Sequence, residues 1–192
     1  MARLAVVLID RWADWEPALL ASGARDDFGD EVRFLSPGGQ PVRSMGGLLA
    51  NVDGDVEDFE PAHADAIAVI GSPLWATDGS PVVTPVLRMA ADAGLAVGGI
   101  CGATLALARA GLLDTRAHTS NGLEFLQQHA AGYHGAERYR DQAQAVSDQR
   151  VVSASGLAPA TFAAEMLRAL HPDKEKEIAQ MLDYFSREHL QR

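Results

Sequence analysis

Cys101, the only cysteine in the chain, is the first residue whose type and setting could carry chemistry. It stands in the segment GGICGA (98–103), directly after an apolar run and directly before a helical pattern. This arrangement has the shape of the G-x-S-x-G turn, which presents a nucleophile above the edge of a sheet, with cysteine in place of serine. The surrounding glycines fit such a turn, because its strand and helix nearly touch.

The setting of Cys101 favours a reactive thiol over an inert one. A free cysteine is more often a buried apolar residue than a nucleophile. Here, however, the sulfur faces the amino end of the following helix, whose partial positive charge favours the thiolate. Because the thiolate is the nucleophilic form, we expect this turn to activate Cys101. The glycines do not indicate a dinucleotide-binding loop, since GGICGA fits G-x-G-x-x-G in no register.

The elements that must position this turn alternate along the chain. Apolar runs rich in β-branched residues predict strands buried on both faces at 4–9, 31–36, 66–71, 96–101 and 150–155. Amphipathic helical patterns lie between them, and strand followed by helix, repeated, is typical of a parallel sheet covered on both faces. We therefore predict an α/β fold: a single-domain three-layer α/β/α sandwich with a mostly parallel central sheet, spanning residues 1–192.

Capping residues set the expected helix ends. Asp14 is a possible N-cap of a helix through 15–24. In the next helix Ser80 is the expected cap and Pro81 the first helical residue, with the end at Gly94. A third helix covers 103–110, and Gly111 is placed to end it in a left-handed conformation.

Two further segments have their own patterns. Residues 41–59 contain Gly and Asp turns, which predict a small hairpin or excursion at the sheet edge. Residues 172–192 combine dense charge on one face with apolar residues on the other, which predicts a C-terminal surface helix docked on the core. The apolar positions are Ile178, Met181, Leu182 and Phe185.

Composition and charge exclude several classes of function. The formal net charge is −10 at pH 7, with 26 acidic residues against 16 scattered basic ones. Nucleic acid is not an expected partner, because binding a phosphate backbone needs clustered Lys and Arg. No apolar run approaches the roughly 20 residues of a membrane helix, so no membrane association is expected. No secretory signal is apparent either, and the cytoplasm is the expected location.

A metal centre is also not expected. One cysteine excludes a disulfide within the chain and any Cys-rich metal site. The six histidines show no ligand spacing such as HExxH. A free thiol is most at home in a reducing compartment, which agrees with a cytoplasmic location.

Several motifs resemble the ThiJ/PfpI superfamily, also called the DJ-one superfamily, whose members are cysteine-dependent relatives of class I glutamine amidotransferases. The family's nucleophile segment is similar to GGICGATLALARAGLLDTRAHTSN (98–121). Its first strand–helix junction resembles RWADWEPALLASGA (11–24), its oxyanion loop AVIGSPLW (68–75), and its closing strand, turn and helix VVSASGLAPATFAAEMLRAL (151–170). The resemblance spans about residues 3 to 170 in the family's order and implies a class I glutamine amidotransferase-like fold with no cofactor.

The resemblance assigns roles to individual positions. Cys101 matches the family's nucleophile, and Glu16 matches the acidic residue beside it. Such a carboxyl can hold or shuttle a proton if it is protonated or shares its proton, because two bare negative charges repel. By itself, Glu16 could equally be a solvated acid in the first turn of a helix. Gly71 and Ser72 match the Gly-Gly pair whose backbone amides form the oxyanion hole, and Gly102 supplies the amide after the cysteine.

The third member of the site stays open. His118 is the downstream candidate, although the spacing could instead place Ser120 or Asn121 opposite the thiolate. Many relatives carry a His immediately after the nucleophile, where this chain has Gly102. No His-x-Glu pair follows residue 150. These departures speak against a glutaminase and against a complete Cys-His-acid hydrolase.

Three tryptophans are candidates for the mouth of the pocket. Trp12, Trp15 and Trp75 lie on loops that the predicted fold gathers at the carboxyl edge of the sheet. We expect Trp75 to contribute to substrate binding. Routine packing or a dimer contact is the alternative for these side chains.

The resemblance implies an enzyme that uses Cys101 on a small electrophilic substrate. Amide hydrolysis, isocyanide hydration and glyoxalase-type conversion of reactive aldehydes are the reactions it suggests. The alternative is a non-catalytic stress or redox sensor in which Cys101 is oxidised. A transcription factor is not expected, because relatives of that kind carry an added helix-turn-helix domain. Since relatives are commonly oligomeric, a small-molecule substrate and a homodimer are the expected partners.

Overall fold

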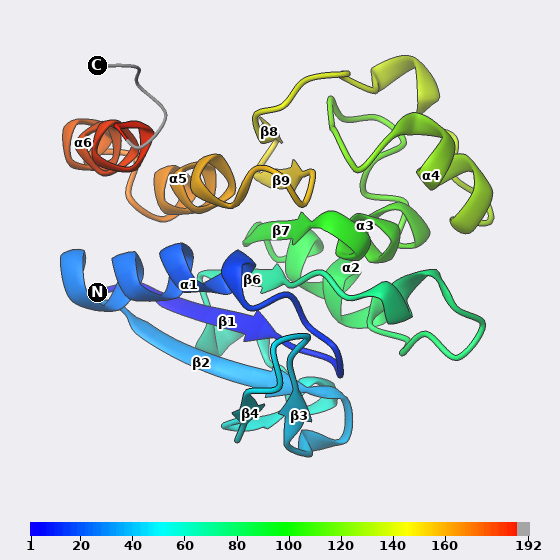
Figure 1. Ribbon diagram of the computed structural model, residues 1–192, viewed down its shortest axis with the longest axis horizontal. Helices are drawn as coiled ribbons and strands as arrows, with labels where there is room; N and C mark the ends of the chain where they lie inside the picture. The colour runs from blue at the N-terminus through cyan, green and yellow to red at the C-terminus, as the bar shows by residue number, and fades with distance from the viewer. Residues whose placement is uncertain (188–192) are drawn as a thin grey trace.

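In the computed structural model, which describes residues 1–187, one seven-stranded sheet runs through the molecule (Figure 1). Its strands are β1 Arg3–Val7, β2 Glu31–Ser36, β5 Gly54–Asp55, β6 Ala66–Val69, β7 Ala96–Ile100, β8 Val146–Asp148 and β9 Val151–Ala154. They lie in the order β5-β2-β1-β6-β7-β9-β8, and only β8 pairs antiparallel with its neighbour. The predicted mostly parallel central sheet is confirmed.

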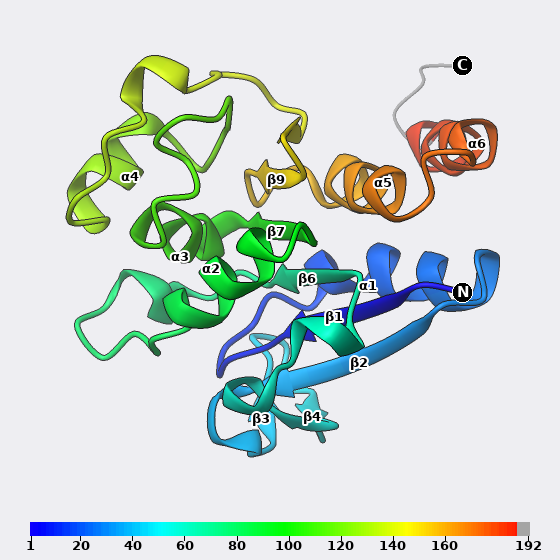
Figure 2. The ribbon, with the colours of Figure 1, turned by 180° about the vertical axis from the view of Figure 1, so that it is seen from behind.

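Helices cover both faces of this sheet (Figures 1 and 2). One face carries α1 (Trp15–Ser22), which continues into a π-helical turn, together with α5 (Pro159–Leu170) and α6 (Glu175–Ser186). The other face carries α2 (Thr84–Asp92), α3 (Thr104–Arg109) and α4 (Leu123–His129). The predicted three-layer α/β/α arrangement is therefore confirmed, although α4 and β8 are not among the elements that the sequence predicts. No helix in the described part of the chain is long and apolar enough to span a membrane.

The central strands β1, β6, β7 and β9 are buried on both faces because successive side chains enter different cores. The predicted burial of 31–36 on both faces is wrong, because Glu31 and Arg33 of β2 are exposed. In β1, Leu4 and Val6 pack with the residues of α1 and α5. Ala5 and Val7 point to the opposite face and pack with the residues of α2 and α3. This explains why the sequence shows a continuous apolar run here rather than an alternating one.

Strand register brings four loops to one edge of the sheet. Val7 pairs with Val69, and Val69 pairs with Gly99. Ile100 in turn pairs with Ala154. Because these strands are parallel, the segments that follow them emerge together, at the edge where ligands bind in open α/β sheets.

Two predicted caps differ in the structure. The helix expected from Pro81 begins at Thr84, and Ser80 instead accepts a hydrogen bond of 3.0 Å from Arg109 Nη1. Asp14 occupies the N-cap position of α1 but makes no capping bond, because its carboxylate accepts hydrogen bonds from a distant hairpin. Gly111 ends its helix with φ +73°, as predicted.

The two irregular segments form the expected kinds of element. Within 41–59, β3 (Val42–Arg43) and β4 (Leu49–Ala50) pair as an antiparallel hairpin, followed by the edge strand β5. In α6, Ile178 is fully buried and Met181 and Leu182 are partly buried, whereas Phe185 is 40% exposed and does not dock as predicted. Residues 188–192 of the predicted C-terminal helix lie outside the described residues.

Candidate active site

Cys101 opens a single 3-10 turn between β7 and α3, with a φ of +57°. A positive φ is uncommon outside glycine and costs on the order of 1–3 kcal/mol. The turn has no room for larger neighbours. A Cβ on Gly102 would lie 2.5 Å from the Ser72 carbonyl oxygen, and a Cβ on Gly99 would lie 2.8 Å from Leu107. The backbone therefore has the strand–turn–helix geometry predicted for Cys101.

Glu16 lies in the first turn of α1, and its side chain is fully buried. Oε2 accepts a hydrogen bond of 2.7 Å from the Gly71 N–H, while Oε1 has no hydrogen-bond partner within residues 1–187. Gly71 lies directly between the carboxyl group and Cys101. A Cβ at position 71 would stand 2.5 Å from Glu16 Oε2 and 2.7 Å from Cys101 Cβ. The absence of a side chain at Gly71 is what lets the acid and the cysteine approach each other.

Burial governs the protonation of both groups. It raises the pKa of Glu16 to about 7, against the lowering effects of the Gly71 amide and the Cys101 side chain. Burial and the negative charge of Glu16 also raise the pKa of Cys101, although Asn121 and the Gly102 amide lower it. The expected lowering of the Cys101 pKa by the helix terminus is therefore wrong in direction, because desolvation beside an acid outweighs it. Near neutral pH, a negative charge on one of the two groups therefore makes ionisation of the other less favourable.

Asn121 connects the cysteine to the loop after β9. Its Oδ1 accepts a hydrogen bond of 2.9 Å from the Gly156 N–H, which orients the amide so that Nδ2 donates to Cys101 Sγ at 3.3 Å. Gly156 packs closely on the sulfur, since a Cβ there would lie 2.8 Å from Sγ. The segments 120–122 and 155–157, far apart in sequence, therefore both contact the thiol.

The thiol opens into a cavity of about 250 Å³. Residues from five segments line it: the loop after β1 with the start of α1, the tip of the β3–β4 hairpin, the turn after β6, the Cys101 turn after β7, and residues 121–125 at the start of α4. Apart from the turn residues beside Cys101, the wall is mostly apolar and is formed by Ala13, Trp15, Met45, Pro73, Ala76 and Phe125. A cysteine thiol, a buried acid and a small apolar cavity thus meet at the carboxyl edge of the sheet.

The model of the DJ-1/PfpI family matches residues 2–169, which include every segment of this site. The chain belongs to the DJ-1/PfpI family. Its sequence is 31% identical over 184 residues to YdeA of Bacillus subtilis, named an uncharacterized protease, covering 95% of this chain and 90% of YdeA. A second uncharacterized protease of that organism, YoaZ, is 36% identical over 132 residues, which cover 67% of this chain and 61% of YoaZ.

Solved structures of the DJ-1 superfamily share the fold. The protein Atu0886 from Agrobacterium tumefaciens superposes with a TM-score of 0.94 at 38% identity, over 99% of this chain and 100% of that one. A thiJ/pfpI family protein from Bacillus anthracis superposes with a TM-score of 0.77 at 27% identity, over 95% and 96% of the two chains. The resemblance to the ThiJ/PfpI superfamily and the predicted fold class are thus confirmed.

His118 does not join the DJ-1/PfpI site, contrary to the prediction. Its ring is fully buried, with Nδ1 2.8 Å from the Arg116 carbonyl and Nε2 2.6 Å from the Tyr133 hydroxyl. Both ring nitrogens are therefore occupied away from the sulfur. Burial also lowers the pKa of His118. Of the open alternatives, Asn121 is the residue that contacts the thiol.

Ser120, the other open alternative, contacts Thr104. Its hydroxyl bonds Thr104 Oγ1 at 2.7 Å, and Thr104 Oγ1 donates to the Cys101 carbonyl at 2.7 Å. This chain of bonds holds the backbone of the DJ-1/PfpI cysteine turn. Ser120 therefore contacts the turn through Thr104, not through the thiol.

The three tryptophans have different environments. Trp75, predicted to bind substrate, is instead fully buried in the core, where its indole N–H donates to the Ile70 carbonyl at 2.8 Å. Trp12 is also buried, at 7% exposure. Only Trp15 lines the cavity, with 51% exposure and an indole N–H 3.3 Å from the Gly156 carbonyl. The prediction that Trp75 binds substrate is wrong, and the alternative of routine packing holds for Trp12 and Trp75, because both side chains turn inward.

The predicted oxyanion donors also need a correction. The Gly71 N–H donates to Glu16, so it cannot at the same time bind an oxyanion. Ser72 and Gly102 both line the cavity, and their amides remain the donors of the predicted set.

Sequence analysis missed Met45, Phe125 and Gly156 as parts of the site. No local motif marks a residue that a hairpin tip, a distant helix or the loop after β9 brings to the thiol. Within residues 1–187, no group of three His, Cys, Asp or Glu side chains is arranged to hold a metal ion.

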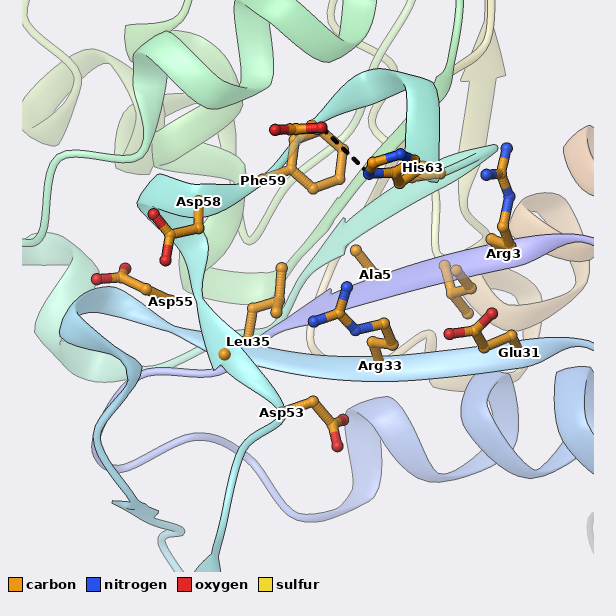
Figure 3. Close-up of a pocket in the computed structure, with 14 residues that line it drawn as sticks. Arg3, Ala5, Glu31, Arg33, Leu35, Asp53, Asp55, Asp58, Phe59 and His63 are labelled. Atoms are coloured by element: carbon orange, nitrogen blue, oxygen red, sulfur yellow. Dashed lines mark ion pairs between the residues drawn. The ribbon is translucent and has the colours of Figure 1, made fainter.

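A second cavity, of about 210 Å³, lies between β1, β2, β5 and the segment 58–64 (Figure 3). Charged side chains of both signs line it, among them Arg3, Arg33 and Asp55. At its rim, His63 Nδ1 lies 3.2 Å from Glu60 Oε2, the contact drawn as a dashed line in Figure 3. Cys101 does not line this second cavity. The charged lining of the second cavity contrasts with the mostly apolar wall of the cavity at Cys101.

Proposed function

We propose that this protein is an enzyme that uses Cys101 as a nucleophile on a small electrophilic substrate. The fully buried Glu16 carboxyl carries the proposal, because it lies against the same glycine as Cys101 and has one oxygen without a partner within residues 1–187. An acid whose pKa is raised to about 7 can accept and return a proton near neutral pH, which is the requirement for general acid–base catalysis.

In the proposed reaction, the Glu16 carboxylate takes the thiol proton as Cys101 Sγ attacks the electrophilic carbon. A carbon–sulfur bond forms, and the electron pair of the substrate's double bond moves to its oxygen or nitrogen, facing the amides of Ser72 and Gly102. For an amide, the electron pair then returns from the oxygen to reform the carbonyl, the carbon–nitrogen bond breaks, and Glu16 donates its proton to the departing amine, which leaves a thioester on Cys101. Water next attacks the thioester as Glu16 takes one of its protons, the carbon–sulfur bond breaks, and Glu16 returns the proton to the thiolate. An acid and an amine are the products.

Amide hydrolysis is the first reaction to test within this class. The names of YdeA and YoaZ as uncharacterized proteases support it, as does family membership. Isocyanide hydration and glyoxalase-type conversion of reactive aldehydes need the same nucleophile and proton carrier. A cavity of about 250 Å³ favours small substrates over folded proteins.

The test is to incubate the purified chain with small amides, isocyanides, glyoxal and methylglyoxal, and with casein as a protein substrate. We expect turnover of at least one small compound, loss of that turnover in Cys101→Ala, and a rate that rises through pH about 7. In Glu16→Gln the rise near pH 7 should disappear, because the proton acceptor is gone. Turnover that survives Cys101→Ala would exclude the proposed nucleophile. Met89→Ala, on α2, is the matched control.

A redox-sensing role is the second candidate, and the partial exposure of Cys101 favours it. A peroxide could reach the sulfur, which would displace water from the peroxide and become a sulfenic acid. The Asn121 amide and a protonated Glu16 could then bond the added oxygen. Intact-mass measurement under mild peroxide should show one added oxygen that is absent from Cys101→Ala. An unmodified wild-type mass would contradict this role.

A further inference from the structure

The outer wall of the Cys101 cavity is built by the tip of the β3–β4 hairpin. Met45 stands at this tip, lines the cavity and is 49% exposed. Its N–H donates to the Trp12 carbonyl at 2.9 Å, so its backbone is attached to the loop that leads into α1. The residue that closes one side of the cavity is thereby held by the loop that positions Glu16.

Asp14 fixes the residues on either side of Met45. Its Oδ1 accepts a hydrogen bond of 2.5 Å from the Ser44 hydroxyl, and its Oδ2 accepts one of 2.8 Å from the Gly46 N–H. There is no spare room in this contact, since a Cβ on Gly46 would lie 2.9 Å from Asp14 Oδ1. The bond with Ser44 is the largest cause of the lowered pKa of Asp14. The Asp14 carboxylate therefore holds the hairpin tip on both sides of Met45.

The cavity offers no counter-charge to a substrate. Of the residues in the described part of the chain that line it, none is Asp, Glu, Lys, Arg or His. Glu16 lies just behind Gly71 and becomes negative as the pH passes about 7. A carboxylate entering the cavity would lose water without gaining a cation, and it would face this negative charge.

The cavity also limits substrate size. Its volume of about 250 Å³ corresponds to about eight water-sized groups at roughly 30 Å³ each. Trp15 and Phe125 line it together with Met45. The indole of Trp15 is held by a bond to Gly156, whereas the Met45 side chain can change its rotamer. The wall can therefore best be enlarged at Met45.

We propose that Met45 is a specificity-determining residue, and that the site takes small uncharged electrophiles with a compact apolar substituent and rejects carboxylates. This inference rests on the proposed function, because it names the substrate class of the same site. Its test uses the reactivity of the Cys101 thiol alone and needs no turnover.

The experiment compares three alkylating agents that share one reacting group: iodoacetamide, iodoacetate and N-benzyl-iodoacetamide. In each case Sγ attacks the CH₂ carbon, the carbon–iodine bond breaks, iodide leaves with the electron pair, and the thiol proton passes to Glu16 or to water. Because the chain has one cysteine, intact mass reports the modification of Cys101 directly. Each rate is divided by the rate of the same agent with 2-mercaptoethanol, an uncharged free thiol.

We expect the normalised rate of iodoacetamide at pH 8 to exceed those of iodoacetate and of N-benzyl-iodoacetamide by about tenfold or more. Met45→Ala should raise the ratio of the N-benzyl rate to the iodoacetamide rate by about tenfold, because the wall is shortened. Met45→Arg should raise the ratio of the iodoacetate rate to the iodoacetamide rate, because it supplies the missing cation. Met89→Ala, at a comparably exposed methionine on α2, should change neither ratio.

Equal normalised rates for the three agents would overturn the inference, as would ratios that Met45→Ala and Met45→Arg leave unchanged. The two proposals can fail separately. Selective alkylation without turnover of any amide, isocyanide or aldehyde would contradict the proposed function and leave the inference standing. Turnover of a small substrate with equal normalised alkylation rates would support the proposed function and contradict the inference about Met45.

Discussion

At the scale of single residues, Glu16 links the reactivity of the site to the stability of the fold. A buried carboxyl with one unpartnered oxygen within residues 1–187 is costly to ionise, which is why its pKa is raised to about 7. In the unfolded chain the ordinary value of 4.5 applies. The native state therefore holds a proton that the unfolded state releases between these two pH values.

This difference predicts a pH-dependent loss of stability. The contribution of Glu16 is fully present below about pH 4.5 and is lost as pH rises through about 7, amounting to about 3 kcal/mol. Glu16→Gln cannot ionise and can still accept from the Gly71 N–H, so it should be the more stable protein at pH 8. Urea unfolding of both proteins at pH 5 and pH 8 measures the change, with the exposed Glu137→Gln as control. An equal pH response in wild type and Glu16→Gln would contradict the assignment.

Asn121 and His118 allow a second prediction at this scale. Asn121→Ala removes the N–H that bonds Cys101 Sγ, and a hydrogen bond to a charged group contributes about 1.5–3 kcal/mol. We expect the rate of Cys101 alkylation by iodoacetamide at pH 8 to fall about tenfold. His118→Gln should lower the melting temperature, because the bond to Tyr133 is lost, but change the alkylation rate less than twofold. A slower alkylation in His118→Gln together with an unchanged rate in Asn121→Ala would instead place His118 at the thiol.

At the scale of elements, the Asp14 carboxylate binds the β3–β4 hairpin instead of capping α1. The sequence predicts that Asp14 caps α1, a role that its position permits. In the structure the same carboxylate binds Ser44 and Gly46 instead, and α1 begins without a side-chain cap. A local signal for a helix start is thus overridden by a contact across 30 residues of sequence.

We predict that Asp14→Ala reproduces the effect of shortening Met45. Without the carboxylate, the hairpin tip loses both bonds that flank Met45, and the cavity wall should yield to larger groups. The ratio of N-benzyl-iodoacetamide to iodoacetamide alkylation should therefore rise severalfold. Met89→Ala, at an exposed residue of α2 that does not line the cavity, is the comparison. An unchanged ratio in Asp14→Ala would show that other contacts suffice to hold the tip.

At the scale of the whole molecule, the two apolar cores share five strands of the central sheet, β1, β2, β6, β7 and β9. Leu4 and Val6 belong to one core, and Ala5 and Val7 to the other, so neither core can lose its packing without affecting β1. That the chain is a single domain stays a prediction from its length and pattern. A homodimer and a cytoplasmic location also stay predictions.

Shared strands predict one cooperative unfolding transition. Ile178 of α6 is fully buried against α5, far along the chain from Cys101. Ile178→Ala should cost about 2–5 kcal/mol and shift the whole transition, because loss of a buried side chain leaves a cavity. Far-UV and near-UV circular dichroism should report the same midpoint in wild type and variant. Separate midpoints would show that the helices around α6 unfold independently. The iodoacetamide rate should not change.

By itself, the sequence determined the layers and the cysteine turn. Continuous apolar runs such as 66–69 identify buried parallel strands, because both faces of such a strand need apolar side chains. The glycines around Cys101 identify the turn, because its close contacts leave no room for a Cβ. Glu16 followed from the family resemblance, since a single acid in a first turn carries no such signal.

Only the tertiary structure decided which side chains meet at the thiol. Asn121 rather than His118 contacts the sulfur, Trp75 turns into the core, and Met45 arrives from a hairpin tip. The direction in which the pKa of Cys101 shifts could likewise not be predicted from the sequence, because it depends on burial beside Glu16 and not on the helix that follows. The physical reason is common to all of these: they depend on contacts between segments distant in sequence, while composition and periodicity report only the local chain.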